Sequence, residues 1–182
     1  MSEANVKFTY SDLLSAPDDG NRYEIFEGEL IVSPSPSEKH QNALSNLFGK
    51  LYTFLQEHKI GKIYTAPFDV YFDEETVVEP DILLVSKERN TIIEEQRING
   101  APDLIVEIIS PKTEDRDRGF KFRRYEKEGV NEYWIVDPDH KTIEIYTLKS
   151  TGYELVKKYA DDESVNSPLL SGLQFNIRDI WK

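Results

Sequence analysis

Two acidic residues occupy sequence positions where an ionised carboxylate is costly. Glu107 lies within DLIVEIIS, residues 103–110, which is apolar on both faces and therefore predicts a central, buried strand. Asp81 begins the apolar run ILLV directly after Pro80, and a proline, which cannot donate to a β-ladder, predicts a bulge or a strand edge there. Because an unpaired carboxylate loses several kcal/mol on leaving water, each acid needs a partner.

A divalent cation could serve as the partner of both acids. If the two strands are neighbours in a sheet, Asp81 and Glu107 would raise each other's pKa unless a cation lay between them. Mg²⁺ suits such a place because it binds one or two carboxylates together with waters and substrate phosphate oxygens. The alternative is structural: Asp81 ends a turn and Glu107 pairs with an arginine or a lysine.

The segment after Glu107 supplies positive charge. Residues 112–127 contain seven Lys and Arg against four Asp and Glu, and form the only clearly basic segment of an acidic chain. Within it, Asp117, Lys121 and Tyr125 stand four residues apart and share one side of a helix. Lys121 could stabilise a phosphate or orient water, Asp117 could hold the lysine, and Tyr125 could position a phosphate. Spacing alone favours the alternative, a solvated helix face with an Asp–Lys pair contributing about 0.3 to 0.5 kcal/mol and Tyr125 in the core.

Two further residues are weaker candidates for the same cleft. His40 lies at the start of the apolar stripe of a predicted helix, where it could act as a base, although a capping or packed histidine is the favoured interpretation. Glu29 could reach the cleft from one face of a predicted strand. Glu24 and Glu27 are equally arguable from the alternation of this segment, and most of these acids are expected to face solvent.

A sheet and two helices are expected to position these residues. An apolar stripe with Ser37 as N-cap predicts a helix over residues 37–57, and Thr113 and Gly129 mark the start and end of a second helix. Predicted strands comprise two that turn at Glu27-Gly28 within 23–33, a meander of 63–72 and 77–85, and then 103–110, 131–138, 141–148 and 153–159. This order indicates an α/β or α+β fold, a mixed sheet covered by helices.

The composition fits one globular domain. The 182 residues, 38% of them hydrophobic and 31% charged, predict a single domain over 20–182 after an N-terminal arm, 1–19. The chain has no apolar run long enough to cross a membrane and its start lacks a signal-peptide pattern, so we expect a cytoplasmic protein without membrane contact. The absence of cysteine excludes disulfides, iron–sulfur clusters and thiolate zinc sites. A net charge of −12 argues against broad electrostatic adhesion to nucleic acid.

Four segments, taken in order along the chain, resemble one known family. They are YEIFEGELIVSPSPSEKHQ, VEPDILLV, PDLIVEIISPKT and DRGFKFRRYEKEGVNEYWIVDP. Together they resemble the Uma-two family of restriction-endonuclease-like proteins over residues 20–178. The resemblance implies the PD-(D/E)XK nuclease fold, a central mixed β-sheet flanked by helices, with a metal-dependent phosphodiesterase site on its acidic strands.

The resemblance also implies roles for individual residues. Asp81 matches the PD aspartate of the family and Glu107 matches its second acid. The pattern expects a lysine two positions later, where this chain has Ile109, and Lys121 on the following helix matches the family's displaced lysine. Asp81, Glu107 and the Ile109 backbone carbonyl would then hold Mg²⁺ or Mn²⁺, and Lys121 would neutralise developing charge. The secondary candidates are Glu29, His40, Asp117 and Tyr125.

Two functions of different classes remain open at this point. The first is a metal-dependent endonuclease that hydrolyses phosphodiester bonds in DNA. The second is a non-catalytic nuclease-fold module that binds a partner or serves in assembly, with the acids kept as a structural network, and the net charge of −12 favours it. Many nucleases of this fold act as dimers, so a homodimer is an open expectation as well.

Overall fold

The main sheet of the protein is six-stranded and mixed. The computed structural model describes residues 6–182. The strand order of this sheet is β11-β10-β9-β8-β6-β3, in which β8 and β9 run parallel and all other neighbours run antiparallel. These strands are β3 (Gly61–Thr65), β6 (Ile82–Ser86), β8 (Leu104–Ile108), β9 (Glu132–Asp137), β10 (Thr142–Lys149) and β11 (Gly152–Tyr159). The expected mixed α+β architecture is confirmed.

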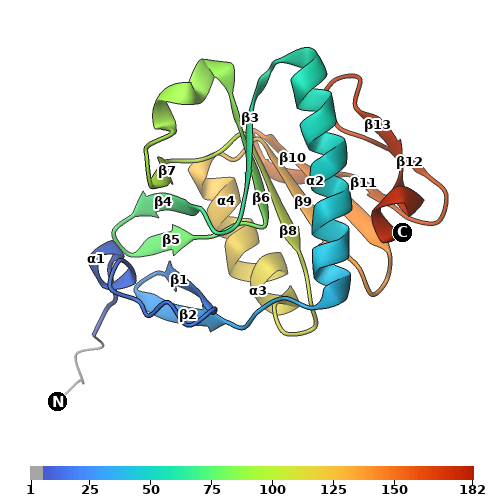
Figure 1. Cartoon of the computed structure of the whole chain (residues 1–182). Coiled ribbons are helices and arrows are strands. Elements are labelled where there is room, and N and C mark those ends of the chain that lie inside the picture. Colours follow the sequence, from blue (N-terminus) through green and yellow to red (C-terminus); the bar gives the residue numbers. More distant parts are fainter. Residues whose placement is uncertain (1–5) are drawn as a thin grey trace.

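A second, five-stranded sheet lies beside the first (Figure 1). Its order is β2-β1-β5-β4-β7, formed by β1 (Arg22–Phe26), β2 (Glu29–Ser33), β4 (Asp69–Asp73), β5 (Thr76–Val78) and β7 (Arg97–Asn99). The predicted pairing of 63–72 with 77–85 is confirmed, because β3 pairs antiparallel with β6 and β4 with β5, but each run is divided between the two sheets. The chain crosses between the sheets at 66–68 and again at 79–81, which places Asp81 at a sheet-to-sheet crossing.

One long helix covers one face of the six-stranded sheet (Figure 1). This helix, α2 (Glu38–His58), begins at Ser37, whose hydroxyl accepts a hydrogen bond from the His40 amide as the N-cap. Its apolar stripe packs against the side chains of β8 that point to this face, Leu104, Val106 and Ile108. The predicted helix over 37–57 is confirmed, and so is the strand with two apolar faces.

The opposite face of β8 meets the second helical segment. The prediction of one regular helix from Thr113 to Gly129 is confirmed in extent, but the helix changes form within it. It consists of α3 (Glu114–Arg116), a π-helical turn over Asp117–Lys121, and α4 (Phe122–Glu128), and it ends at Gly129 in the left-handed conformation. Tyr125 of α4 packs in one buried cluster with Ile105 and Tyr133, so this segment covers the face that carries Glu107.

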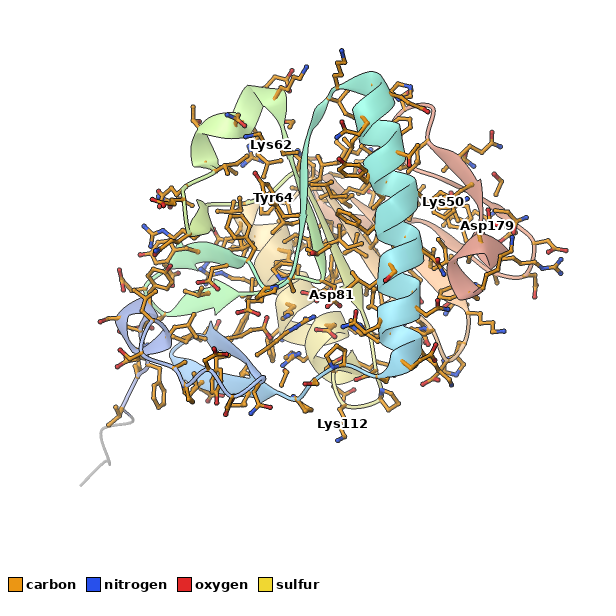
Figure 2. The ribbon with its side chains drawn as sticks, viewed as in Figure 1. Lys50, Lys62, Tyr64, Asp81, Lys112 and Asp179 are labelled. Atoms are coloured by element: carbon orange, nitrogen blue, oxygen red, sulfur yellow. The ribbon has the colours of Figure 1, made fainter. Side chains whose placement is uncertain are left out.

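The two ends of the described chain pack onto this framework. Of the expected N-terminal arm, residues 1–5 lie outside the described residues, and α1 (Tyr10–Leu13) buries Leu13 against Ile25 and Val77. At the other end, β12 (Ser164–Asn166), β13 (Gln174–Asn176) and a 3₁₀ turn over Ile177–Trp181 close over α2. Lys50 of α2 and Asp179 of that turn, 2.8 Å apart, face each other in Figure 2. Among the described residues, no helix is long and apolar enough to cross a membrane.

Candidate active site

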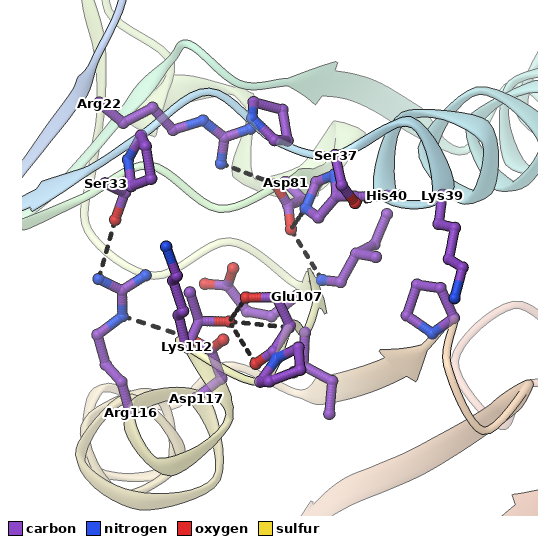
Figure 3. Close-up of a pocket in the computed structure, with 18 of the residues that line it drawn as sticks. Arg22, Ser33, Ser37, Lys39, His40, Asp81, Glu107, Lys112, Arg116 and Asp117 are labelled. Atoms are coloured by element: carbon purple, nitrogen blue, oxygen red, sulfur yellow. Dashed lines mark hydrogen bonds and ion pairs between the residues drawn. The ribbon is translucent and has the colours of Figure 1, made fainter.

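A pocket of about 610 Å³ opens where the parallel strands β8 and β9 end (Figure 3). The carboxyl ends of parallel strands are the usual place for ligand sites in sheets of this kind. The walls are the loop 33–37, the first turn of α2, the segment 107–113 and the turn at 138–139. Six of the eight residues singled out from the sequence line this pocket: His40, Asp81, Glu107, Ile109, Asp117 and Lys121.

Asp81 is held from three directions. Its Oδ1 accepts a hydrogen bond from Arg22 Nη1 at 2.7 Å, and its Oδ2 accepts one from the Ile108 amide at 2.8 Å. His40 Nε2 lies 3.1 Å from the same Oδ2. Although burial alone would raise the pKa of Asp81, its contacts with His40, Arg22 and the Ile108 amide hold that pKa below the ordinary value. Asp81 is therefore an ionised carboxylate fixed to the end of β8.

Glu107 lies on β8 and turns toward the second helical segment. Its Oε1 accepts hydrogen bonds from Lys121 Nζ at 2.9 Å and from the Tyr125 hydroxyl at 2.7 Å. Burial and, with it, the nearby charges of Asp117, Asp81 and Glu24 raise the pKa of Glu107 to about 8, against the opposing effect of Lys121. The Tyr125 ring lies in the core behind Glu107, so Tyr125 orients this acid from the side opposite the pocket.

Lys121 is a fully buried cation shared among three acids. Its Nζ lies 2.7 Å from Glu24 Oε1, 2.9 Å from Glu107 Oε1 and 3.9 Å from Asp117 Oδ1. Burial opposes its charge, but Glu107, Glu24 and Asp117 together raise the pKa of Lys121 above its ordinary value, so it stays an ammonium group. The interpretation as an exposed surface pair is wrong, because the π-helical turn directs both Asp117 and Lys121 toward the pocket.

Glu24, not Glu29, is the acid that the first hairpin contributes. Glu24 Oε1 also accepts a hydrogen bond from the Glu79 amide at 3.0 Å, and Glu24 Oε2 lies 3.5 Å from Arg116 Nη1. The expectation for Glu29 was wrong, because Glu29 is exposed and does not line the pocket. Glu24 and Glu29 share a face of the hairpin, but Glu29 pairs with Phe26 beside the turn, at the end away from the pocket.

The protein supplies the cations that the sequence left unassigned. The two acids do lie in one pocket, but a divalent ion is not needed as their first partner: Arg22 pairs with Asp81, beside the His40 ring, and Lys121 pairs with Glu107, as the structural alternative expected. No set of three His, Asp or Glu side chains within residues 6–182 is arranged to hold a metal ion on its own.

The charges of the inner pocket still leave room for a cation. Four acidic side chains line the pocket together with three side chains that are always positively charged; the acids are Glu24, Asp81, Glu107 and Asp117, and the bases are Arg22, Arg116 and Lys121. The raised pKa of Glu107 means that these bases do not keep all four acids ionised at neutral pH. Asp117 Oδ1 is buried without a hydrogen-bond partner. Mg²⁺ needs only one or two protein carboxylates, so this donor set fits a hard divalent cation.

The direction of the backbone indicates which carbonyl at the end of β8 shares the side of Asp81. The Ile109 amide donates to the Val136 carbonyl of β9 at 2.8 Å, whereas the Ile108 amide donates to Asp81. Successive residues of a strand turn their N–H and C=O groups to opposite sides, so at the end of β8 the Ile108 carbonyl shares the side of Asp81. The backbone therefore favours Ile108 over the expected Ile109 as an oxygen ligand.

The basic segment 112–127 does not form a single cationic face. Three of its seven basic residues line the pocket: Lys112, Arg116 and Lys121. Arg118 instead binds Glu144 of β10, and Arg124 pairs with Asp73 and Glu128. The local excess of positive charge is thus divided among several acids, and the part that reaches the pocket is small.

Comparisons with known proteins identify the family and agree with the fold. A family model described as "putative restriction endonuclease" matches residues 10–178. An uncharacterized protein of Synechocystis sp. is 24% identical over 166 residues, which cover 88% of this chain and 84% of that protein. The crystal structure of a "putative nuclease belonging to DUF820" from Anabaena variabilis has the same fold, with a TM-score of 0.78 and 24% identity over 96% of this chain and 97% of the other.

Proposed function

The chain belongs to the Uma2 family, and we propose that it is a metal-dependent nuclease that hydrolyses phosphodiester bonds in DNA. The observation that carries this proposal is the meeting of Asp81, Glu107 and the buried Lys121 in one pocket. Two acids next to a lysine with a raised pKa are the groups that such hydrolysis needs: oxygen ligands for a cation and a fixed positive charge for the phosphate.

The proposed cation is Mg²⁺ or Mn²⁺, held by Asp81, Glu107 and a backbone carbonyl of β8, for which Ile108 is the better placed. When bound there, it would supply a water of lowered pKa and charge neutralisation at the phosphate. Asp81 and Glu107 are suited to hold it because their carboxylates are fixed by Arg22, His40 and Tyr125.

The chain's own residues would position the phosphate and balance its charge. Lys121 brings an ammonium group that remains protonated throughout, so it would stabilise negative charge as it develops on the phosphoryl oxygens. Arg22 and Arg116 carry guanidinium groups at the same pocket, and a planar guanidinium binds phosphate with two parallel hydrogen bonds. Because the chain carries a net charge of −12, the attraction for the DNA phosphates would come from these few cations in the pocket.

A second candidate function is a non-catalytic nuclease-fold module for binding or assembly. The observation that favours it is that Asp81 and Glu107 both have protein cations as partners already. In that case the acids, Arg22 and Lys121 would form a structural network across the ends of β6 and β8.

DNA cleavage in the presence of Mn²⁺ distinguishes the two candidates. We expect the wild-type chain to nick or cut single-stranded or plasmid DNA, and Asp81→Asn and Glu107→Gln to lose this activity. Glu144→Gln is the matched control, because Glu144 is a buried carboxylate outside the pocket. If the wild type cleaves neither DNA form, or if Asp81→Asn cleaves as fast as the wild type, the nuclease proposal fails and the second candidate replaces it.

A further inference from the structure

The five-stranded sheet ends in an open strand, β2. Among the described residues β2 pairs only with β1, and Figure 1 shows it along the lower margin of the molecule. An edge strand presents unpaired N–H and C=O groups along its outer side, which another strand can bind. Proteins that remain monomeric protect such edges with Lys or Arg side chains, proline, bulges or very short strands.

The other outer strands of the two large sheets are protected in these ways. β3 carries Lys62, and β7 is only three residues long and begins with Arg97. β11 carries Lys157 and Lys158 and has an irregular register with β10. β2, with the sequence ELIVS, has no lysine, arginine, proline or register shift, and its one charged side chain stands beside the turn. Its edge is therefore the unprotected one of these four.

The outer face of β2 is apolar as well. Leu30 and Val32 are 36% and 50% exposed, and they point to the same side of the sheet. They lie opposite Ile25 and Tyr23 of β1, and Ile25 belongs to the small buried cluster beneath α1. A strand added at this edge would extend that cluster by covering the two exposed side chains.

We propose that β2 pairs antiparallel with β2 of a second copy of this chain, about a two-fold axis at Ile31. In this register Ile31 faces the partner's Ile31, and Leu30 faces the partner's Val32. The pairing is self-complementary, because apolar residues meet apolar residues and Glu29 meets the partner's Ser33 rather than another acid.

Charge complementarity selects a second copy over an unrelated strand. Ser33 accepts a hydrogen bond from Arg116 Nη1 at 3.1 Å, and Ser33 pairs with Arg22 in the β1–β2 register. Glu29 and Ser33 lie on the face of β2 opposite Leu30 and Val32. The partner's Glu29 would lie beside Ser33 there, close to the Arg116 guanidinium, and the two-fold symmetry repeats this contact at the other end of the interface. Because Ser33 also lines the pocket, the two pockets of the dimer would open near its axis.

The absence of cysteine in this chain allows a direct test by cross-linking. Across the axis, Ile31 would form a non-hydrogen-bonded antiparallel pair, in which Cα atoms lie about 4.5 Å apart, within the range of about 4.4 to 6.8 Å that disulfides span. We expect Ile31→Cys, oxidised with diamide, to form a covalent dimer on a non-reducing gel. Leu155→Cys on the protected edge strand β11, where Leu155 is 51% exposed, is the control and should stay monomeric.

A second pair of variants tests the interface without cysteine. Val32→Lys places a charge on the proposed interface at an exposed position, and Leu155→Lys places the same charge on β11. By sedimentation velocity we expect a dimer for the wild type and Leu155→Lys, and at least tenfold weaker association for Val32→Lys, whose far-ultraviolet circular dichroism spectrum should stay that of the folded wild type. A monomeric wild type, or Val32→Lys that associates as tightly as the wild type, would overturn the proposal. None of these measurements depends on nuclease activity.

Discussion

Glu107 and Glu144 are two buried acids that accept closely similar hydrogen bonds, yet their pKa values are shifted in opposite directions. Each accepts a hydrogen bond from a tyrosine hydroxyl at 2.7 Å and from a lysine Nζ at 2.9 Å. Burial opposes the charge of both, yet burial raises the pKa of Glu107 to about 8, whereas Arg118 with Tyr146 and Lys158 lowers that of Glu144 to about 2. The kind of donor therefore does not decide the protonation of a buried acid.

Burial is the largest cause of the raised pKa of Glu107, and the two sites differ in the number of donors that oppose burial and in how many acids share them. Glu144 receives two hydrogen bonds from Arg118, at 2.8 and 3.1 Å, in addition to its lysine. Glu107 shares Lys121 with Glu24 and Asp117, so the charge of that one lysine is divided among three carboxylates. The negative charge of Glu144 is therefore balanced by the cations beside it, whereas the acids around Lys121 can accept a further cation.

Removing the shared lysine should produce the largest effect. Lys121→Met leaves Glu24, Glu107 and Asp117 without their common cation, and breaking a buried ion pair from one side costs about 3 to 5 kcal/mol. We expect this loss in the free energy of unfolding in urea at neutral pH. Arg118→Met should cost less, because Glu144 keeps Lys158 as an ion-pair partner. A smaller loss for Lys121→Met than for Arg118→Met would contradict the comparison.

The second-largest effect should be metal binding, which we expect at the acids around Lys121 and not at Glu144. A ligand present at roughly 100 times its Kd stabilises the folded state by about 2.7 kcal/mol, so Mn²⁺ should raise the melting temperature of the wild type. We expect no rise for Glu107→Gln or Asp81→Asn, and the full rise for Glu144→Gln. Equal rises in all four proteins would mean that Mn²⁺ binds elsewhere.

The pH dependence of stability should sharpen the comparison at Glu144. Because the pKa of Glu144 is lowered in the folded state, its carboxylate stabilises the fold fully above the ordinary value of 4.5, and this contribution is lost as the pH falls toward about 2. We expect Glu144→Gln to be less stable than the wild type at pH 6, and the gap to narrow as the pH falls below 4.5. Urea unfolding in metal-free buffer measures this gap, and a gap that widens toward low pH would refute the assigned sign.

Removing the hydroxyl of Tyr125 or of Tyr146 should change the free energy of unfolding least. Tyr125→Phe removes a hydroxyl that donates to Glu107 in the core, and Tyr146→Phe removes one from a carboxylate that keeps Arg118 and Lys158. A lost hydrogen bond costs about 0.5 to 1.5 kcal/mol, and we expect Tyr125→Phe near the upper value and Tyr146→Phe near the lower. Equal free energies of unfolding for the two variants would mean that Glu107 does not depend on its tyrosine donor more strongly than Glu144 does.

The sequence was sufficient to predict that Asp81 and Glu107 need partners, because the free-energy cost of burying a carboxylate can be read from the residues around it. An acid in a strand with two apolar faces must have a partner whatever the fold, and this argument correctly predicted that Glu107 is buried and paired. In the same way, Pro80 correctly marked the break in the strand before Asp81. The spacing of Asp117, Lys121 and Tyr125 placed them on one side of a helix but favoured a solvated face, whereas Lys121 and Tyr125 contact Glu107.

The partners of these acids could not be predicted in the same way. Arg22 and His40 reach Asp81 from segments 59 and 41 residues away, and no local pattern encodes such contacts. Glu24 of β1 and Glu29 of β2 share a face of the hairpin, so alternation cannot tell which of them lies at the end near the pocket. The division of 63–72 and 77–85 between two sheets depends on which strands pair, and that is decided by the whole fold.

Anomalous diffraction from crystals soaked in Mn²⁺ tests the central claim most directly. The account predicts one manganese peak within coordination distance of both Asp81 and Glu107, and no peak at Glu144. A peak bound to neither acid, or no peak in a pocket whose side chains stay fully paired with Arg22 and Lys121, would contradict it.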